Sequence, residues 1–487
     1  MSFKKLNIAG KLSSFSFFDS FKHASVYFLG TIMVQGLGIV SLPVLTFFLT
    51  TEEYGIANVY LTYSAMASVL LSLNLEWAIS RYFLEPDADK KGFMATIITA
   101  ITIFFTVSGL VIYIYREPIS ELLNLSPKLI SWLLLFTYTN IFWLAYGYIK
   151  IIEKKSKNMV IAQVLVQYGK FGAAVFGIWY LMTIGQEGYM GKIIGEFIVN
   201  ALAMVVFIYL LWPYFDFKRM RWAHFRYAIS YSLPLVPYAL GGHLLTSFDQ
   251  WYINSELGHE KAGLYSFAFK IGMLMYGLLV ALQNASVVQY TEWMDAKEYK
   301  KVSTQVFSMH KLTILAGLFL ILFSVDLGTL LAAKESFREA MNIVPIIVGA
   351  YIFNGIAWNY NRVFNYKKQN IYLTVILLTA AALNMFLNIQ FVPTYGYQAA
   401  AYTTLFSYVI MALLAWLVSD YWLKIPALPL GKIMLTTAPL IFITIGFYIL
   451  GWQSIGLNWG IIAIKISVFG VFGLVLFYST LRKILGV

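Results

Sequence analysis

The sequence contains no cysteine, and only 12% of its 487 residues carry a charge. The absence of cysteine excludes disulfide bonds, thiolate metal sites and cysteine nucleophiles. The few charged residues gather in short stretches, and long apolar segments run between them. Hydrophobic residues make up 60% of the chain. This distribution is typical of a protein that crosses a membrane several times.

About fourteen apolar segments are long enough to cross a bilayer, because a helix needs about 20 apolar residues to span roughly 30 Å of hydrocarbon. The segment 93–115 is apolar on all sides, whereas a strand of a membrane barrel would alternate apolar and polar residues. The sequence therefore predicts an all-α polytopic membrane protein. The predicted spans are 24–49, 57–84, 93–115, 129–149, 159–183, 189–212, 229–256, 263–290, 306–332, 341–364, 371–393, 398–423, 433–451 and 458–481.

Positive charge lies mainly on one side of these spans. When alternate loops are assigned to opposite sides, most of the 35 Lys and Arg residues fall on the same side as the N-terminus. An excess of Lys and Arg in the loops marks the cytoplasmic side of a membrane protein. We therefore expect both termini in the cytoplasm, since the number of spans is even. Residues 1–23 contain both lysines and phenylalanines, and they predict a cytoplasmic segment that lies at the membrane interface.

The loops between the spans are short, which excludes a soluble catalytic domain. The net charge of +12 could indicate nucleic acid, but anionic lipid headgroups explain it more simply than a binding domain that such loops cannot form. The stretch nearest to a glycine-rich phosphate loop, around Gly191 and Lys192, lacks the first glycine and the Ser or Thr after the lysine. We expect no enzyme activity, no cofactor and no metal site, and an energy source other than ATP.

Two parts of the chain resemble each other at one constant offset. Gly55 matches Gly263, and Gly188 matches Gly396. An even number of spans separates the matching positions, so the repeats would run parallel, as in many transporters; chance similarity between apolar helices is the alternative. The predicted division is a cytoplasmic segment 1–23, a first lobe 24–212, a basic linker 213–228, a second lobe 229–423, and a C-terminal pair of spans 424–487.

Ionisable residues inside the spans are the candidates for function, because a charge at the bilayer centre costs about 2.5–3.5 kcal/mol unless it is paired or faces water. Lys170 lies near the middle of its span and is a candidate cation for binding an anion. The alternative is an ion pair with Glu76 or Glu196. Asp249 and Lys270 lie symmetrically about the turn between two spans. They are predicted at equal depth, either as a salt bridge or as a pair that lines a cavity and couples an ion.

Two further cations and two prolines have alternative interpretations. Arg81 lies near the predicted cytoplasmic mouth, where it could meet a phosphate or snorkel to the interface. Lys465 lies outside both repeats and is expected to snorkel. Pro234 and Pro237 would kink or loosen their helix. They mark either an accommodated kink or a hinge for opening the lobes.

Four stretches carry a recognisable pattern. The first lobe contains FLTTEEYGIANVY followed by LNLEWAISRYF, and the second contains YSLPLVPYAL and SFDQWYINSELGHEKAGLYSFAFK. These stretches resemble the polysaccharide-transport branch of the multidrug/oligosaccharidyl-lipid/polysaccharide (MOP) exporter superfamily, which includes the O-antigen flippases. Gln250 stands where that family commonly has a basic residue. In the second lobe the signature-like residues are Pro234, Asp249, Ile253, Gly258, Gly263, Tyr265, Ser266 and Lys270.

The resemblance implies a flippase of the bacterial inner membrane that moves undecaprenyl-pyrophosphate-linked oligosaccharide to the outer leaflet by alternating access, for O-antigen, capsule or a related polysaccharide. Its implied partners are that lipid-linked substrate, membrane lipids, and a polysaccharide polymerase with its assembly proteins. The candidates for attracting the head group are Lys170, Arg81 and Lys270. The candidate counter-charges, or sites for a coupling proton or Na⁺, are Glu76, Glu196 and Asp249.

Two other functions fit the residues less well. An ion-coupled exporter of small cationic drugs or metabolites could share the fold, but the cavity candidates are mainly basic. A membrane polysaccharide polymerase would need a sizeable outer loop or a soluble domain with acid and base residues, and the loops are too short for either.

Overall fold

The computed structural model describes the chain except for residues 1–29, 31–32, 154, 426–429, 453–457 and 486–487. The described residues are almost entirely helical and contain no strand. Twelve of their helical stretches are long and apolar enough to cross a membrane. A shorter apolar helix, Met33–Phe48, corresponds to the described part of the first predicted span. The predicted all-α polytopic fold is confirmed, while the predicted segment 1–23 lies outside the described residues.

One helical stretch contains more than one crossing. Trp222–Val287 is 66 residues long, whereas about 20 residues suffice to cross a bilayer. Within it, α10 (Val236–Gly272) is interrupted at Gly258, where φ is 82°. Glycine adopts this conformation without steric cost because it has no Cβ. The stretch therefore contains two apolar helices joined at Gly258, in agreement with the predicted spans 229–256 and 263–290.

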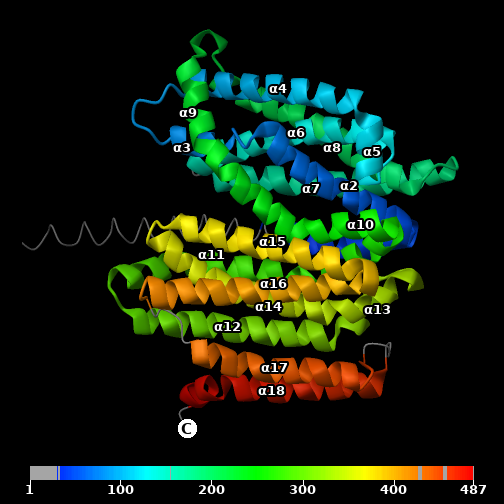
Figure 1. Ribbon diagram of the computed structural model, residues 1–487, viewed down its shortest axis with the longest axis vertical. Coiled ribbons are helices and arrows are strands. Elements are labelled where there is room, and N and C mark those ends of the chain that lie inside the picture. The colour runs from blue at the N-terminus through cyan, green and yellow to red at the C-terminus, as the bar shows by residue number, and fades with distance from the viewer. Residues whose placement is uncertain (1–29, 31–32, 154, 426–429, 453–457, 486–487) are drawn as a thin grey trace, which may run out of the picture. The chain divides into compact units, whose positions relative to one another are not determined.

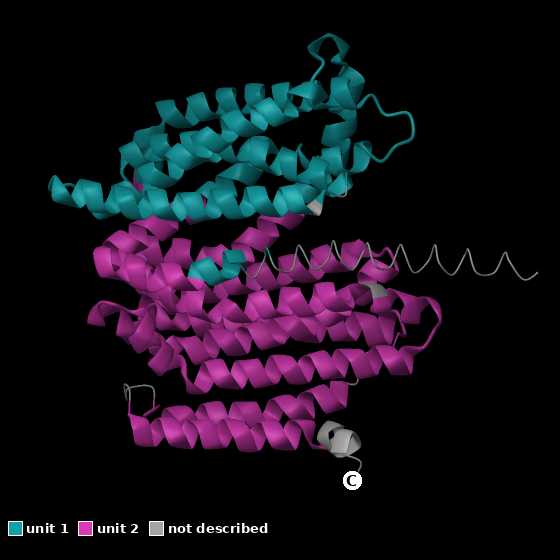
Figure 2. Ribbon diagram, turned by 180° about the vertical axis from the view of Figure 1, so that it is seen from behind, with its two compact units in different colours: residues 1–38, 64–120, 126–237 teal, residues 39–63, 121–125, 238–487 magenta. Residues whose placement is uncertain are grey.

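The chain forms two compact units, which Figure 2 shows in different colours. Unit 1 comprises residues 1–38, 64–120 and 126–237. In this unit α7 (Ser156–Thr183) and α8 (Gly188–Leu211) lie side by side, and α6 (Pro127–Ile152) packs against α8 (Figure 1). The elements that lie wholly or mainly in unit 1 are α3 (Trp77–Tyr82), α4 (Lys90–Ile114), α5 (Arg116–Leu123), α6 (Pro127–Ile152), α7 (Ser156–Thr183), α8 (Gly188–Leu211), η1 (Trp212–Tyr214), η2 (Phe217–Arg219), α9 (Trp222–Ser232) and η3 (Leu233–Leu235).

Unit 2 comprises residues 39–63, 121–125 and 238–487. Its core lies where α14 (Val344–Tyr366) packs between α12 (Tyr299–Leu322) and α16 (Gln398–Leu417). Helix α15 (Asn370–Tyr395) packs against α16. Helix α2 (Thr51–Ser72) begins in unit 2 and ends in unit 1. The other elements of unit 2 are α10, α11 (Leu274–Asp295), α12 (Tyr299–Leu322), α13 (Ser324–Leu331), η4 (Glu335–Ile343), α14 (Val344–Tyr366), α15 (Asn370–Tyr395), α16 (Gln398–Leu417), η5 (Val418–Trp422), α17 (Leu430–Ile449) and α18 (Trp459–Leu485).

Two glycines explain why the start of α2 belongs to unit 2, although the sequence placed it in the first lobe. A Cβ atom on Gly55 would lie 1.9 Å from the carbonyl oxygen of His259, and one on Gly263 would lie 2.0 Å from that of Thr51. The backbones of α2 and α10 therefore touch at a point where only glycine fits. Gly55 and Gly263 are also the two positions that the sequence repeat relates.

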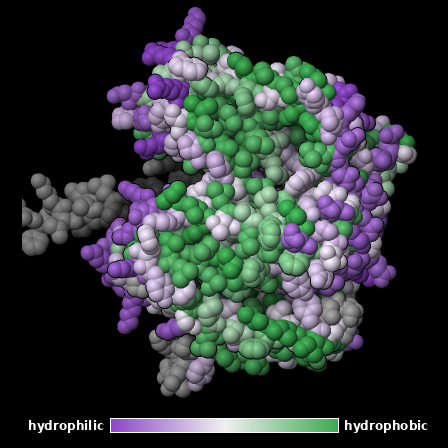
Figure 3. Space-filling view, viewed as in Figure 1, coloured by the Kyte–Doolittle hydropathy of each residue, from purple (hydrophilic) through white to green (hydrophobic). Residues whose placement is uncertain are grey.

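Apolar side chains cover the middle of the visible helices, and hydrophilic side chains gather at the helix ends (Figure 3). In the most apolar stretch of α7, only 6% of the residues are buried within the protein, and in that of α18 only 11% are. Apolar faces this large are unfavourable in water but stable in lipid. The protein is therefore a multi-pass membrane protein.

A buried ion pair fixes the last helix to the rest of unit 2. Nζ of Lys465 on α18 lies 2.6 Å from Oδ2 of Asp326 on α13, and the two side chains are 1% and 8% exposed. A second buried contact joins α12 to α17, where Nε2 of His310 lies 3.0 Å from Oγ1 of Thr437. The expectation that Lys465 snorkels is wrong, because a buried carboxylate neutralises its ammonium group inside the protein.

We predict that Lys465→Met destabilises the protein by about 3–5 kcal/mol, because it leaves the Asp326 carboxylate buried without its partner. The double variant Lys465→Met/Asp326→Leu should recover most of this loss, since it removes both charges. Thermal unfolding of the purified protein in detergent measures both effects. Lys432→Met, which removes an exposed lysine of α17, is the control. Equal destabilisation in the single and double variants would contradict the assignment.

Candidate functional site

Unit 2 contains a polar site around the carboxylate of Asp249. This residue lies on α10 and is 1% exposed. Its Oδ1 accepts a hydrogen bond of 2.6 Å from Nδ2 of Asn388. Its Oδ2 accepts one of 2.5 Å from the hydroxyl of Tyr265 and one of 2.6 Å from Oγ1 of Thr404. The carboxylate is thus held by neutral donors from α10, α15 and α16.

A second layer of side chains orients these donors. Oδ1 of Asn388 accepts a hydrogen bond of 2.7 Å from Thr403, and Asn388 also donates to Oδ1 of Asn384 at 3.2 Å. Asn384 in turn donates to Oγ1 of Thr404 at 3.2 Å. All four residues are buried. A closed network of this kind holds each dipole in one orientation, which a partly satisfied network would not do.

The composition of this site limits its chemistry. It offers one carboxylate together with hydroxyl and amide oxygens, which suit a proton or a small hard cation. Among the described residues, no group of three or more His, Cys, Asp or Glu side chains could hold a metal ion. A single buried carboxylate can be neutralised by one positive charge, so the site is suited to a monovalent ion.

Asp249 and Lys270, which the sequence predicted at equal depth, have different contacts. The hydrogen-bond donors to Asp249 are neutral, and the ammonium of Lys270 lies 4.9 Å from the centre of the Tyr54 ring. These contacts do not support the predicted salt bridge between Asp249 and Lys270. Gln250, which stands in place of the family's basic residue, accepts a hydrogen bond of 2.8 Å from Thr62.

Unit 1 contains a cluster of two lysines and one glutamate. Nζ of Lys192 lies 2.7 Å from Oε1 of Glu196, one turn further along α8. Lys170 on α7 interacts electrostatically with both residues, and its ammonium lies 5.7 Å from the centre of the Phe136 ring. With both lysines protonated, the cluster has one positive charge in excess of its carboxylate, which would attract an anion.

A seam of small residues brings this cluster together. A Cβ atom on Gly191 would lie 2.2 Å from the carbonyl oxygen of Gly177, and one on Gly195 would lie 2.2 Å from that of Ala173. The backbones of α7 and α8 therefore approach closely beside Lys192 and Glu196. Small residues permit such close packing between membrane helices.

None of the described contacts joins the remaining sequence candidates to either of these two sites. Glu76 is buried between α2 and α3, and Arg81 is exposed near the end of α3. Pro234 lies in η3, and Pro237 is the second residue of α10. The boundary between the two compact units falls directly after Pro237. This position is compatible with the hinge hypothesis, which remains a prediction.

Sequence reasoning missed part of both sites. It selected Asp249 by its charge but not the neutral residues Asn384 and Asn388. Their spacing of one helical turn within an apolar span is a signal that could have found them. It also treated Lys192 only as part of a failed phosphate-loop match. The glycines Gly191 and Gly195 that flank it at helical spacing were the missed signal.

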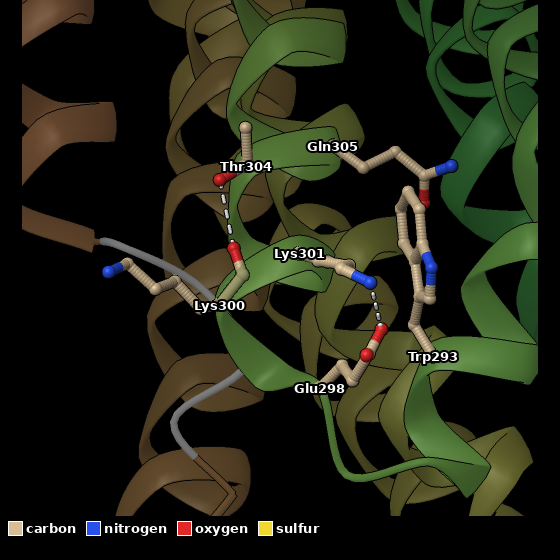
Figure 4. A pocket seen from close by; sticks show the side chains of 6 residues that line it. All are labelled: Trp293, Glu298, Lys300, Lys301, Thr304 and Gln305. Atoms are coloured by element: carbon tan, nitrogen blue, oxygen red, sulfur yellow. Dashed lines mark hydrogen bonds and ion pairs between the residues drawn. The ribbon is translucent and has the colours of Figure 1, made fainter.

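A hollow of about 640 Å³ lies at the start of α12 and is drawn in Figure 4. Its lysines are poorly placed to bind an anion. Lys301 is tied to Glu298 by an ion pair of 2.7 Å. Lys300 extends away from Trp293 and Gln305, on the other side of the helix (Figure 4). We therefore do not assign the substrate site to this hollow.

Charged side chains gather where α6 ends and the loop to α7 begins. Nζ of Lys150 lies 2.8 Å and that of Lys155 lies 3.0 Å from Oε2 of Glu153, and the hydroxyl of Tyr214 donates to the same carboxylate. Burial by itself would raise the pKa of Glu153, but these hydrogen bonds outweigh it and lower the pKa to about 2. Glu153 is therefore ionised at neutral pH and ties this basic loop to η1.

The fold is that of transporters of the MOP superfamily. The structure of the lipid II flippase MurJ, in an inward closed conformation, matches with a TM-score of 0.70 at 17% identity, covering 93% of this chain and 99% of that one. An inward-facing multidrug resistance MATE family transporter matches with a TM-score of 0.56 at 13% identity, covering 82% and 94% of the two chains. At these identities the similarity establishes the fold alone.

A family model described as "Polysaccharide biosynthesis protein" matches residues 20–290. This match covers more than half of the chain, which therefore belongs to the polysaccharide biosynthesis protein family. A relative from Haemophilus influenzae, the Lsg locus putative protein 1, is 22% identical over 308 residues, which cover 62% of this chain and 72% of that protein. The family resemblance predicted from the sequence is confirmed.

We predict that Gly191→Leu separates α7 from α8 and destabilises the protein by about 1–3 kcal/mol, the usual cost of overpacking. Gly172→Leu is the matched control, because Gly172 also lies in this helix pair but a Cβ atom added to it would have no neighbour within 4 Å. Thermal unfolding in detergent measures both variants. The seam would lose its assigned importance if Gly191→Leu were as stable as the control.

Proposed function

We propose that this protein moves a polyprenyl-pyrophosphate-linked oligosaccharide from the inner to the outer leaflet of the bacterial inner membrane during polysaccharide biosynthesis. The observation that carries the proposal is the combination of its family with its architecture. The family belongs to polysaccharide biosynthesis, yet the described residues are membrane helices joined by short loops. A chain built in this way is suited to moving a membrane-bound intermediate rather than to making or breaking glycosidic bonds.

The charged residues support the same proposal. A pyrophosphate head group is anionic and needs cations in a hydrated environment, while its polyprenyl tail can remain in lipid. The Lys170, Lys192 and Glu196 cluster supplies a net positive charge in unit 1, and Lys270 supplies a further cation in unit 2. We assign head-group attraction to Lys170 and Lys270, with Arg81 contributing near the cytoplasmic side and Glu196 as the counter-charge.

We further propose that Asp249 couples transport to an ion. Its carboxylate is buried among neutral donors, so binding a proton or Na⁺ would change the charge of the unit 2 core by one unit. An ion that binds one conformation more tightly than another shifts the balance between them. Alternating access would then follow the ion gradient, with both termini in the cytoplasm as the positive charge of the loops indicates.

The test is the leaflet location and length of lipid-linked oligosaccharides in cells that lack this protein. Single repeat units trapped on the cytoplasmic side would support the flippase. Unpolymerised repeat units on the outer side would indicate a polymerase. Unchanged lipid-linked sugars together with increased drug accumulation would favour the cationic drug exporter, a function compatible with the similarity to the MATE family transporter.

We predict that Lys170→Ala reduces polysaccharide output at normal protein level. A contact to a charged group is worth about 1.5–3 kcal/mol, so its loss would weaken head-group binding by roughly 10–100-fold. Lys170→Arg keeps the charge and should retain most of the output. Quantifying the surface polysaccharide of complemented deletion cells measures both. Full output from Lys170→Ala would remove the role assigned to this lysine.

A further inference from the structure

Three aromatic side chains of unit 2 meet inside the predicted spans, on helices that are distant along the chain. The ring centroids of Tyr276 on α11 and Trp358 on α14 lie 5.3 Å apart, and the ring planes meet at 73°. Tyr238 on α10 interacts electrostatically with Tyr276. All three residues are half-buried, whereas Tyr351, whose ring lies 6.2 Å from that of Tyr276, is buried. The group therefore rests on the core of unit 2 and keeps part of its surface outside that core.

The geometry of the Tyr276 and Trp358 pair leaves ring faces uncovered. In an edge-to-face pair the edge of one ring points at the face of the other, so neither ring covers both faces of its neighbour. A sugar ring carries apolar C–H groups on its face and hydroxyl groups around its rim. It can therefore lie on an aromatic face while its hydroxyls reach polar groups beside the ring. Tyr and Trp suit such a mixed surface, because each joins a large apolar ring to one polar group.

Amide side chains lie on the same side of α11 as Tyr276. Gln283 follows Tyr276 by about two helical turns and is half-buried, and its Nε2 donates a hydrogen bond of 3.2 Å to Oδ1 of Asn359 on α14. Asn284, the next residue, is exposed. An exposed amide is costly against lipid tails, because they offer no hydrogen-bond partner. This side of α11 is therefore suited to a hydrated space rather than to lipid.

Two polar groups on α14 lack hydrogen-bond partners one turn after Trp358. Within the described part of the chain, Oδ1 of Asn361 and Nη2 of Arg362 are buried without a partner. Arg362 is 9% exposed; Cζ of its guanidinium lies 4.1 Å from the centre of the Tyr290 ring, and Nη1 lies 4.0 Å from Sδ of Met309. Residues three and four positions apart share one side of a helix, so both groups lie on the side of Trp358. One group accepts and the other donates, and a sugar hydroxyl can satisfy both.

We propose that Tyr276 and Trp358 form a carbohydrate subsite, in which a sugar ring of the transported head group lies on the aromatic pair. The amides of Gln283 and Asn361 and the guanidinium of Arg362 form hydrogen bonds with the hydroxyls of that sugar. The subsite takes a ring that presents an apolar C–H face, and it recognises the sugar rather than the pyrophosphate. This inference rests on the proposed function, because it names the part of the lipid-linked oligosaccharide that unit 2 recognises.

The test compares two probes that bind to the purified full-length protein in detergent. One probe is undecaprenyl pyrophosphate, which carries no sugar. The other is the lipid-linked oligosaccharide extracted from cells that lack this protein. Dissociation constants for both probes are measured with the wild type, Trp358→Leu, Tyr276→Leu and Trp358→Tyr, which keeps a ring. Trp143→Leu is the matched control, because Trp143 is also half-buried and its ring lies 5.5 Å from that of Phe207 in unit 1.

We expect the wild type to bind the sugar-bearing probe more tightly than undecaprenyl pyrophosphate. Trp358→Leu and Tyr276→Leu should each weaken the binding of the sugar-bearing probe by roughly 2–10-fold, the effect of one aromatic contact. Neither variant should change the binding of undecaprenyl pyrophosphate, because the sugar alone contacts the rings. Trp358→Tyr should retain most of the affinity, and Trp143→Leu should match the wild type with both probes.

The subsite is overturned, and the proposed function stands, if the wild type binds both probes equally. The same holds if folded Trp358→Leu and Tyr276→Leu variants keep the preference of the wild type for the sugar-bearing probe, or if they lose affinity for both probes alike. If the wild type binds neither probe, the proposed function fails and the subsite fails with it.

Gln283→Ala keeps both rings and tests the subsite in case the ring variants do not fold, which thermal unfolding in detergent reveals. It removes one amide that bonds the sugar, so it should reduce the preference for the sugar-bearing probe and leave the binding of undecaprenyl pyrophosphate unchanged. An unchanged preference in a folded Gln283→Ala variant would overturn the subsite as well.

Discussion

The interior of a membrane offers no water, so each buried polar group must find its partner within the protein. Four buried or half-buried carboxylates differ in how far they meet this requirement. Asp326 pairs with Lys465 and thereby fixes α18 to unit 2. Glu196 pairs with Lys192 beside a second lysine. Asp249 accepts hydrogen bonds from three neutral donors. Within the described part of the chain, one carboxylate oxygen of Glu76 and one of Asp326 are buried without a hydrogen-bond partner.

These differences distinguish carboxylates that are held in an ion pair from those that are held by neutral groups. The Asp326–Lys465 ion pair holds two helices together, and the two charges neutralise each other. A carboxylate among neutral donors can gain or lose a positive charge without breaking a salt bridge, because no cationic side chain is paired with it. Asp249 is of this second kind, because its three hydrogen-bond donors are all neutral.

Close helix packing is the second constraint, and glycine supplies it in both units. The contact between Gly55 and the His259 carbonyl allows α2 to touch α10, and the contact between Gly191 and Gly177 allows α7 to touch α8. Lipid does not drive helices together as water does, so close van der Waals packing between backbones carries more of the association. The α7 and α8 seam has a further consequence, because it brings Lys170 within electrostatic reach of Lys192 and Glu196.

The sequence by itself determined the membrane helices, because the hydrophobicity that drives a span into lipid is a local property of about 20 residues. It also marked Asp249, Glu76 and Lys170, since a charge inside an apolar span is visible without a structure. Only the tertiary structure decided what each charge contacts. Lys465 was expected at the interface but lies against Asp326, which is distant along the chain. The neutral partners of Asp249 come from three helices. Hydrogen bonds and ion pairs act over a few ångströms in space, and sequence spacing does not determine which distant helices come that close.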